Sequence, residues 1–196
     1  SRGVPRPGRA GSFAASVAPS RSPQPVDLRI YQAGEQQPSP DAMRSLQTHV
    51  DQFVARMGPS AQAASAASGV PGPLILAQAA LESGWGKREI RADDGTPSFN
   101  LFGIKADRSW KGPTVEITTT EYVDGEPQKV RAKFRAYASY DEAFADYARF
   151  ITRNPRYANV LATDDPAQAA HGLQRAGYAT DPQYGHKLVR IMQKFG

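Results

Sequence analysis

Apolar residues recur at helical spacing between residues 41 and 83. From 41 to 57 they occupy one face of a helix, and Gly58 and Pro59 follow, which predicts that this helix ends at residue 57. The alanine-rich segment 60–67 predicts a short second helix, and the apolar run 71–83 predicts a third. We therefore expect three consecutive helices in this part of the chain.

The pattern then changes from helical spacing to strand alternation. The segment 86–111 is rich in Gly, Asp, Pro and Asn and predicts a loop region of the kind that often carries function. The segment 114–123 is rich in β-branched residues, Asp124-Gly125 is a hairpin turn signal, and 129–137 alternates as a return strand. A β-hairpin is predicted here.

Helical spacing returns after the hairpin. Ser139 and Glu142 form a capping box that begins a helix through Thr152, and Asn154-Pro155 ends it.

Two more helices are expected near the C-terminus. Asp165-Pro166 and Asp181-Pro182 each match an N-cap aspartate followed by a proline at the first helical position, so the helices should run to Ala176 and to about Lys194. The order of elements predicts a mainly helical α+β fold with a larger helical lobe and a small hairpin lobe.

Residues 1–40 differ in composition from the rest of the chain. They are rich in Pro, Ser, Gly, Ala and Arg, which predicts a flexible linker or arm and leaves 41–196 as one folded domain. Four arginines of this arm nearly equal the net charge of +5: Arg2, Arg6, Arg9 and Arg21. The arm could hold the protein near an anionic polymer, but we expect no nucleic-acid surface on the folded domain.

Several absences narrow the chemistry. Cysteine is absent, which excludes disulfides, thiol catalysis and thiolate metal sites. No apolar run approaches the roughly 20 residues of a membrane span, so no membrane insertion is expected. The histidines are scattered, at His49, His171 and His186, and match no metal-binding spacing; neither a metal nor a cofactor is predicted.

The segment 76–86 places a carboxylate at the end of an apolar helix. Glu82 follows Leu81, and Gly84 suits the left-handed conformation that ends helices. Lost hydration beside Leu81 and Trp85 and the negative end of the helix dipole both push the pKa of Glu82 upward. A raised pKa suits a general acid, whereas an ordinary helix-end glutamate in solvent is the alternative.

Strand parity singles out a second carboxylate. Side chains alternate between the two faces of a strand, so Glu121 shares a face with Val115 and Ile117, while Glu116 lies on the polar face. A charge among apolar residues is costly unless it is paired, protonated or facing a cleft. Glu121 is therefore the better functional candidate.

Two alternatives remain for Glu121, namely a bulge that reverses its face or a salt bridge to Arg131 or Lys133. If neither alternative holds, Glu82 and Glu121 form the carboxylate pair that glycoside hydrolysis requires. Glu82 would protonate the leaving oxygen. The second group would activate water at a separation of about 6.5–9.5 Å or attack directly at about 5 Å.

Aromatic residues supply further candidates. Tyr178 follows Gly177 in a short link between two predicted helices, where its hydroxyl could reach a substrate. Trp85, Phe102 and Tyr140 could stack on sugar rings. For all four aromatic residues, burial in the core is the alternative.

Six motifs occur in order between residues 47 and 195: AQAALESGWG at 77–86, NLFGIK at 100–105, TEY at 120–122, FRAY at 134–137 with Ser139, NPRY at 154–157 and AGYATDP at 176–182. Together they resemble glycoside hydrolase family 73, the peptidoglycan-cleaving N-acetylglucosaminidases, and within it the flagellar members.

The resemblance implies a lysozyme-like fold, with an α-lobe and a hairpin lobe around a glycan groove, that cleaves β-1,4 bonds of peptidoglycan. It implies Glu82 as the catalytic acid, Glu121 as the second catalytic residue and Tyr178 as a tyrosine needed for activity or sugar binding. Five further residues are expected to contact the substrate: Trp85, Asn100, Phe102, Gly103 and Tyr140.

Flagellar members of this family carry an N-terminal rod-assembly domain joined to the hydrolase by a linker. Because the chain begins at Ser1 without a methionine, we expect it to be a piece of such a protein, which would meet flagellar rod proteins through that missing domain. We expect a monomer that acts in the periplasm, associated with the flagellum.

Three competing interpretations stay open. A muramidase or a lytic transglycosylase would act on the same polymer, although a transglycosylase needs no second carboxylate, so Glu121 argues mildly against it. A non-catalytic wall-binding scaffold would be expected to lack the acid, yet Glu82 stands in its complete motif.

Overall fold

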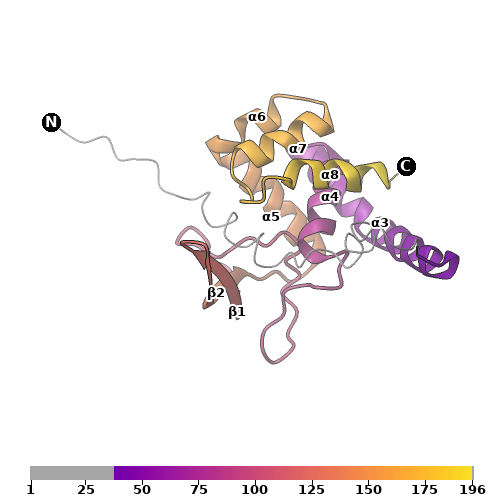
Figure 1. Cartoon of the computed structure of the whole chain (residues 1–196). Coiled ribbons are helices and arrows are strands. Elements are labelled where there is room, and N and C mark those ends of the chain that lie inside the picture. The colour runs from indigo at the N-terminus through magenta and orange to yellow at the C-terminus, as the bar shows by residue number, and fades with distance from the viewer. Residues whose placement is uncertain (1–37, 196) are drawn as a thin grey trace.

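The computed structural model describes residues 38–195 and places a small antiparallel hairpin beside a lobe of helices (Figure 1). In chain order the elements are α3 (Pro40–Ser68), α4 (Gly72–Ser83), β1 (Thr114–Val123), β2 (Glu126–Arg135), α5 (Tyr140–Arg153), the 3-10 turn η1 (Pro155–Tyr157), α6 (Ala158–Leu161), α7 (Pro166–Arg175) and α8 (Tyr184–Gln193). The predicted α+β class with two unequal lobes is confirmed.

Helix α3 corrects the prediction of two separate helices. It runs unbroken for 29 residues from its N-cap Ser39 and contains Pro59 in its interior. A proline inside a helix costs about 3 kcal/mol, because a hydrogen bond is lost and the ring meets the preceding turn. One buried stripe spans the proline on both sides, and burying it favours a single helix; its members are Val50, Phe53, Met57, Ala61 and Ala64.

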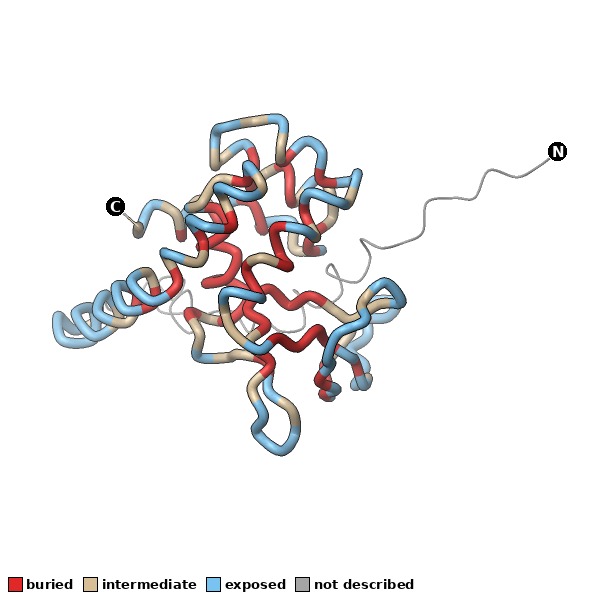
Figure 2. The backbone as a smooth tube through the Cα atoms, turned by 180° about the vertical axis from the view of Figure 1, so that it is seen from behind, coloured by how far each residue is buried: buried red, intermediate tan, exposed pale blue. Residues whose placement is uncertain are grey.

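Helix α4 forms the centre of the helical lobe. Every residue from Leu74 to Ser83 is buried, as expected for a helix that is surrounded by others. Gly84 ends it in the left-handed conformation, with φ of 57°, as predicted. Figure 2 shows the buried positions gathered in the interior of this lobe, while the N-terminal part of α3 projects into solvent.

The hairpin forms with an unbroken register from Thr114 opposite Arg135 to Val123 opposite Glu126. Asp124 and Gly125 make the turn, both at positive φ. Because so tight a turn allows pairing at once, β2 begins at Glu126 rather than at the predicted residue 129. The inner face of the hairpin covers a second small core formed by Ile90, Val115, Ile117, Ala132, Phe134 and Ala136.

The C-terminal helices follow their predicted caps with one exception. Ser139 accepts a hydrogen bond from the amide of Glu142 at the start of α5, and Asp165 accepts one from Ala167 at the start of α7. Helix α8 begins at Tyr184, later than Asp181-Pro182 predicted. The carboxylate of Asp181 instead accepts from the amide of Gln183, 2.8 Å away, and this local turn takes the place of the first helical turn.

The short elements η1 and α6 were not predicted. The predicted arm falls mainly on residues 1–37, which lie outside the described residues, and α3 begins at Pro40, just inside the predicted boundary. In the described part of the chain, no helix combines the length and the apolar character that crossing a bilayer would require.

Candidate active site

Glu82 lies in the last turn of α4, and only 6 % of its surface is exposed. This burial excludes the alternative of a helix-end glutamate in open solvent. The hydroxyl of Tyr184, the first residue of α8, donates a hydrogen bond to Oε1 of Glu82 over 2.9 Å. The carboxyl group is therefore held by a side chain from the far end of the sequence.

Glu82 belongs to a chain of buried polar side chains. The hydroxyl of Tyr147 on α5 donates to Oε1 of Gln78, and Nε2 of Gln78 donates to the hydroxyl of Tyr184 over 3.0 Å. Burial raises the pKa of Tyr147 and of Tyr184 well above the ordinary value, and the neighbouring Glu82 raises that of Tyr184 further. Both tyrosines therefore remain neutral donors.

Sequence reasoning missed Tyr184 as a site residue. It occurs outside the quoted motifs, and its helix was expected from residue 181, so no local signal connected it to Glu82. The hydrogen bond joins residues 102 positions apart in the chain. Only the packing of α8 against α4 brings them together.

Tyr178 lies against this group in the interior. Its ring stacks on that of Tyr184, with centroids 5.9 Å apart and an interplanar angle of 14°. Burial raises the pKa of Tyr178 well above its ordinary value, and the nearby Glu82 raises it further. Its hydroxyl donates to the carbonyl of Phe102 over 2.9 Å, so in this conformation it matches the alternative of a buried, hydrogen-bonded tyrosine.

Asn100 organises the loop that carries Phe102 and Gly103. Its side-chain amide donates to the carbonyls of Ile104, at 2.9 Å, and Arg135, at 3.0 Å, while its Oδ1 accepts from the amides of Phe102 and Ile104. Gly103 has φ of 66°, a conformation that favours glycine. Both residues act within the loop, and contact with substrate remains a prediction for them.

The three predicted sugar-stacking aromatics differ in environment. Phe102 is 1 % exposed and stacks on Tyr147 with centroids 4.3 Å apart, so in this conformation it matches the alternative of burial in the core. Trp85 is buried, with its ring edge-on to that of Phe53. Tyr140 is half-buried, and its hydroxyl donates to Glu89 over 2.8 Å. A sugar contact stays a prediction for all three residues.

Glu121 lies on the inner face of β1, as strand parity predicted. The register contains no bulge, and Arg131 pairs instead with Glu116 and Asp93. The partner of Glu121 is Lys105, whose Nζ lies 2.5 Å from Oε1; the two side chains are 11 % and 26 % exposed, in the order Lys105 and Glu121. Glu121 is therefore paired, but to a loop residue that sequence reasoning did not consider.

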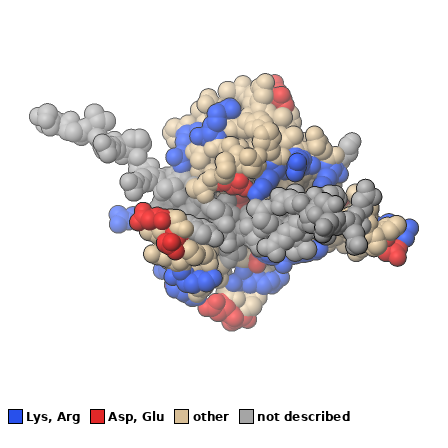
Figure 3. Space-filling view, viewed as in Figure 1, with Lys and Arg blue, Asp and Glu red and all other residues tan. Residues whose placement is uncertain are grey.

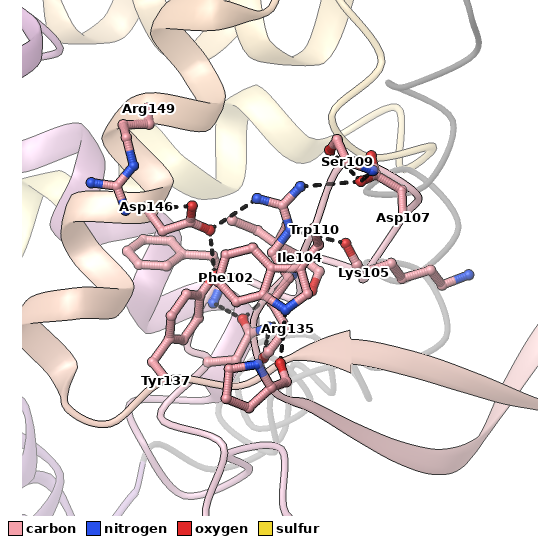
Figure 4. A network of polar contacts seen from close by, with 12 residues as sticks. Phe102, Ile104, Lys105, Asp107, Ser109, Trp110, Arg135, Tyr137, Asp146 and Arg149 are labelled. Carbon is pink, nitrogen blue, oxygen red and sulfur yellow. Dashed lines mark hydrogen bonds and ion pairs between the residues drawn. The ribbon is translucent and has the colours of Figure 1, made fainter.

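A second polar network fixes the base of the hairpin to the helical lobe (Figure 4). The guanidinium of Arg135, at the end of β2, pairs with Asp146 on α5 over 3.0 Å and with Asp107 over 3.6 Å. Its Nε donates to the carbonyl of Lys105 over 3.3 Å. Burial, and then the charge of Asp146, raise the pKa of Tyr137, whose hydroxyl donates to Asp146 over 2.6 Å.

The loop 100–105 thus connects the two candidate carboxylates. Its Phe102 carbonyl accepts from Tyr178, beside Glu82, and its Lys105 side chain pairs with Glu121. A buried carboxyl group on one side and an ion-paired carboxylate on the other suit acid catalysis on a glycosidic bond.

The described residues show mixed surface charge and no cluster of metal-binding side chains. On the face seen in Figure 3, positive and negative side chains are interspersed over both lobes rather than gathered in one basic field. Among residues 38–195, no three His, Asp or Glu side chains gather into a group that could hold a metal ion.

Comparison with known proteins identifies the family. The family model described as glucosaminidase, mannosyl-glycoprotein endo-beta-N-acetylglucosaminidase, matches residues 58–196. The peptidoglycan hydrolase FlgJ of Escherichia coli K12 is 59 % identical over 142 residues, which cover 72 % of this chain and 45 % of that protein. The chain therefore spans less than half the length of this relative.

Two solved structures share the fold. A C-terminally truncated glycoside hydrolase domain of Salmonella typhimurium FlgJ is 57 % identical with a TM-score of 0.64, covering 74 % of this chain and 97 % of its own. A peptidoglycan hydrolase mutant from Sphingomonas sp. A1 is 47 % identical with a TM-score of 0.67 and the same coverage of both chains. This chain belongs to the glucosaminidase family, glycoside hydrolase family 73.

Proposed function

We propose that this domain hydrolyses the β-1,4 glycosidic bonds of peptidoglycan as an endo-β-N-acetylglucosaminidase, with Glu82 as the general acid. The observation that carries the proposal is the buried carboxyl group of Glu82, held by the hydroxyl of Tyr184 at the end of α4. Burial disfavours the ionised form of a carboxyl group, so Glu82 is suited to give a proton to the leaving oxygen. Membership of the family supports the choice of reaction.

Glu121 is the proposed second catalytic residue. Its ion pair with Lys105 holds the side chain in place against the loop 100–105, where it could activate water, attack directly or stabilise a positively charged transition state. Tyr178 is proposed to support the site from beside Glu82 through its hydrogen bond to the loop 100–105.

The cellular setting is proposed on the resemblance to flagellar members of the family. The domain would act in the periplasm, where it would open the wall for the passage of the flagellar rod. Rod proteins would then be its partners, through a region outside the residues described.

Digestion of purified peptidoglycan tests the reaction. The chain and its Glu82→Gln variant are incubated with the polymer, and the products are reduced with borohydride and identified by mass spectrometry. We expect reduced N-acetylglucosamine ends from the chain, and a rate about 10² to 10⁴ times lower from the variant, which has no carboxyl proton to give.

Other products would replace this proposal. Reduced muramic acid ends would make the domain a muramidase, anhydro ends a lytic transglycosylase, and no release by either protein would favour a wall-binding scaffold.

A matched pair on one strand tests the second carboxylate. Glu121→Gln should lower turnover strongly, whereas Glu116→Gln, on the opposite face of β1, should leave it unchanged. Normal turnover by Glu121→Gln would remove Glu121 from the chemistry.

A further inference from the structure

Tyr184 contacts two side chains that lie one helical turn apart on α4. Its hydroxyl oxygen lies 3.0 Å from Nε2 of Gln78 and 2.9 Å from Oε1 of Glu82. Residues four positions apart on a helix lie on the same face, so one hydroxyl group can bridge them. Tyr184 thus joins the candidate acid to the buried polar chain.

The chemistry of these groups fixes the direction of the hydrogen bonds. Nε2 of Gln78 can only donate, so the Tyr184 oxygen accepts from it. A tyrosine hydroxyl carries one proton, and that proton is then directed to Oε1 of Glu82. Gln78 is held in this orientation because its own Oε1 accepts from Tyr147.

We infer that Tyr184 is a positioning residue that fixes the orientation of the catalytic carboxyl group of Glu82. The hydrogen bond from the Tyr184 hydroxyl to Oε1 holds the carboxyl group in one orientation, and the transfer of its proton to the leaving oxygen depends on that orientation. The inference deepens the proposed function and rests on Glu82 as the general acid.

Ring and backbone contacts both fix the position of Tyr184. Its ring is buried and stacks on Tyr178, and its amide donates to the carbonyl of Asp181 over 3.1 Å. The next residue, Gly185, donates its amide to the side chain of Gln174 on α7, and a Cβ there would lie 2.5 Å from the ring of His171. The glycine lets the start of α8 approach α7 this closely, so the position of the hydroxyl is set by the backbone as well as by the ring.

The test removes only the hydroxyl group. Tyr184→Phe is compared with the chain and with Tyr157→Phe, a control that removes, from an equally buried ring, a hydroxyl with no hydrogen-bond partner among the described residues. Turnover is measured on soluble peptidoglycan glycan fragments as kcat and KM separately, and folding is followed by thermal melting.

We expect Tyr184→Phe to lower kcat by about 10- to 100-fold, since a misplaced proton donor loses much of its effect. KM should stay within about twofold, because the contact acts in the transition state rather than on substrate binding. Tyr157→Phe should have the same kcat and KM as the unsubstituted chain. A kcat of Tyr184→Phe equal to that of the control would overturn the inference.

A second variant tests the inference independently if Tyr184→Phe does not fold. Gln78→Met keeps the length of the side chain but removes the amide that orients the Tyr184 hydroxyl, so kcat should again fall while KM holds. An unchanged kcat in Gln78→Met would also contradict the inference. If the chain cleaves and Glu82→Gln does not, a normal Tyr184→Phe defeats this inference alone, whereas an inactive chain defeats the proposed function and the inference together.

Discussion

The ammonium group of Lys105 lies 2.5 Å from Oε1 of Glu121, and this ion pair ties the loop 100–105 to the hairpin. The backbone of Lys105 pairs with Phe134 of β2. Glu121, on β1, lies opposite Gln128, six residues earlier on β2. Along a straight strand those two positions of β2 would lie about 20 Å apart, farther than the two side chains reach. The hairpin therefore curls back toward the loop, as its curved strands in Figure 1 illustrate.

Replacement of Lys105 tests the value of this ion pair. Lys105→Met should lower kcat on purified peptidoglycan by about tenfold, because Glu121 loses the charged partner that holds its side chain in place. Lys105→Arg keeps the charge and should retain most of the activity. Equal rates for the Met and Arg variants would show that the pair plays no part in the reaction.

The glycine that ends α4 should be intolerant of a side chain. Gly84 has φ of 57°, and a Cβ there would lie 2.7 Å from the guanidinium of Arg88. Gly84→Ala should lower the free energy of unfolding by about 1–2 kcal/mol through backbone strain, measured by urea denaturation.

Gly58 supplies the matched control. It lies within α3 just before Pro59, and apart from its chain neighbours and the helix backbone a Cβ at this position would meet no atom within 4 Å. Gly58→Ala should therefore stabilise the helix, but by less than the roughly 1 kcal/mol of an ordinary helical position, because a Cβ before a proline disfavours the α conformation. The prediction fails if both substitutions shift the urea midpoint in the same direction.

The buried pair of Arg135 and Asp146 should be essential to stability. Asp146→Asn leaves the guanidinium partly uncompensated in the interior and should cost about 3 kcal/mol of unfolding free energy. Asp93→Asn breaks an ion pair of Arg131 at the surface and should cost less than about 1 kcal/mol. Similar urea midpoints for the two variants would contradict this ranking.

Alkaline pH should destabilise the domain through its buried tyrosines. Burial raises the pKa of Tyr157 to about 12 and raises that of Tyr178 and Tyr184 well above the ordinary value. In the unfolded chain a tyrosine loses its proton near pH 10, so above that pH the unfolded state binds fewer protons than the folded one. The stabilisation is complete below pH about 10 and is lost as the pH rises through the folded-state values.

Urea denaturation between pH 9 and 12 measures this effect, with each buried tyrosine contributing a slope of at most about 1.4 kcal/mol per pH unit. Tyr157→Phe removes one contribution and should flatten the slope below pH 12. A stability that stays constant across this range would refute the prediction.

Local signals in the sequence determined most elements and one feature of the site. Ser139 and Asp165 predicted helix starts, Asp124-Gly125 predicted the hairpin turn, and strand parity placed Glu121 on the inner face. Each of these signals depends on backbone geometry within a few residues, which the neighbouring side chains control directly.

Tertiary structure decided the rest. Pro59 lies inside α3 because a buried stripe continues past it, and Tyr184 reaches Glu82 because α8 packs on α4. Lys105 pairs with Glu121 because the hairpin curls back to the loop. These contacts depend on how whole elements pack, and the free energy of burying a shared surface is a property of the assembled core that no local pattern of residues contains.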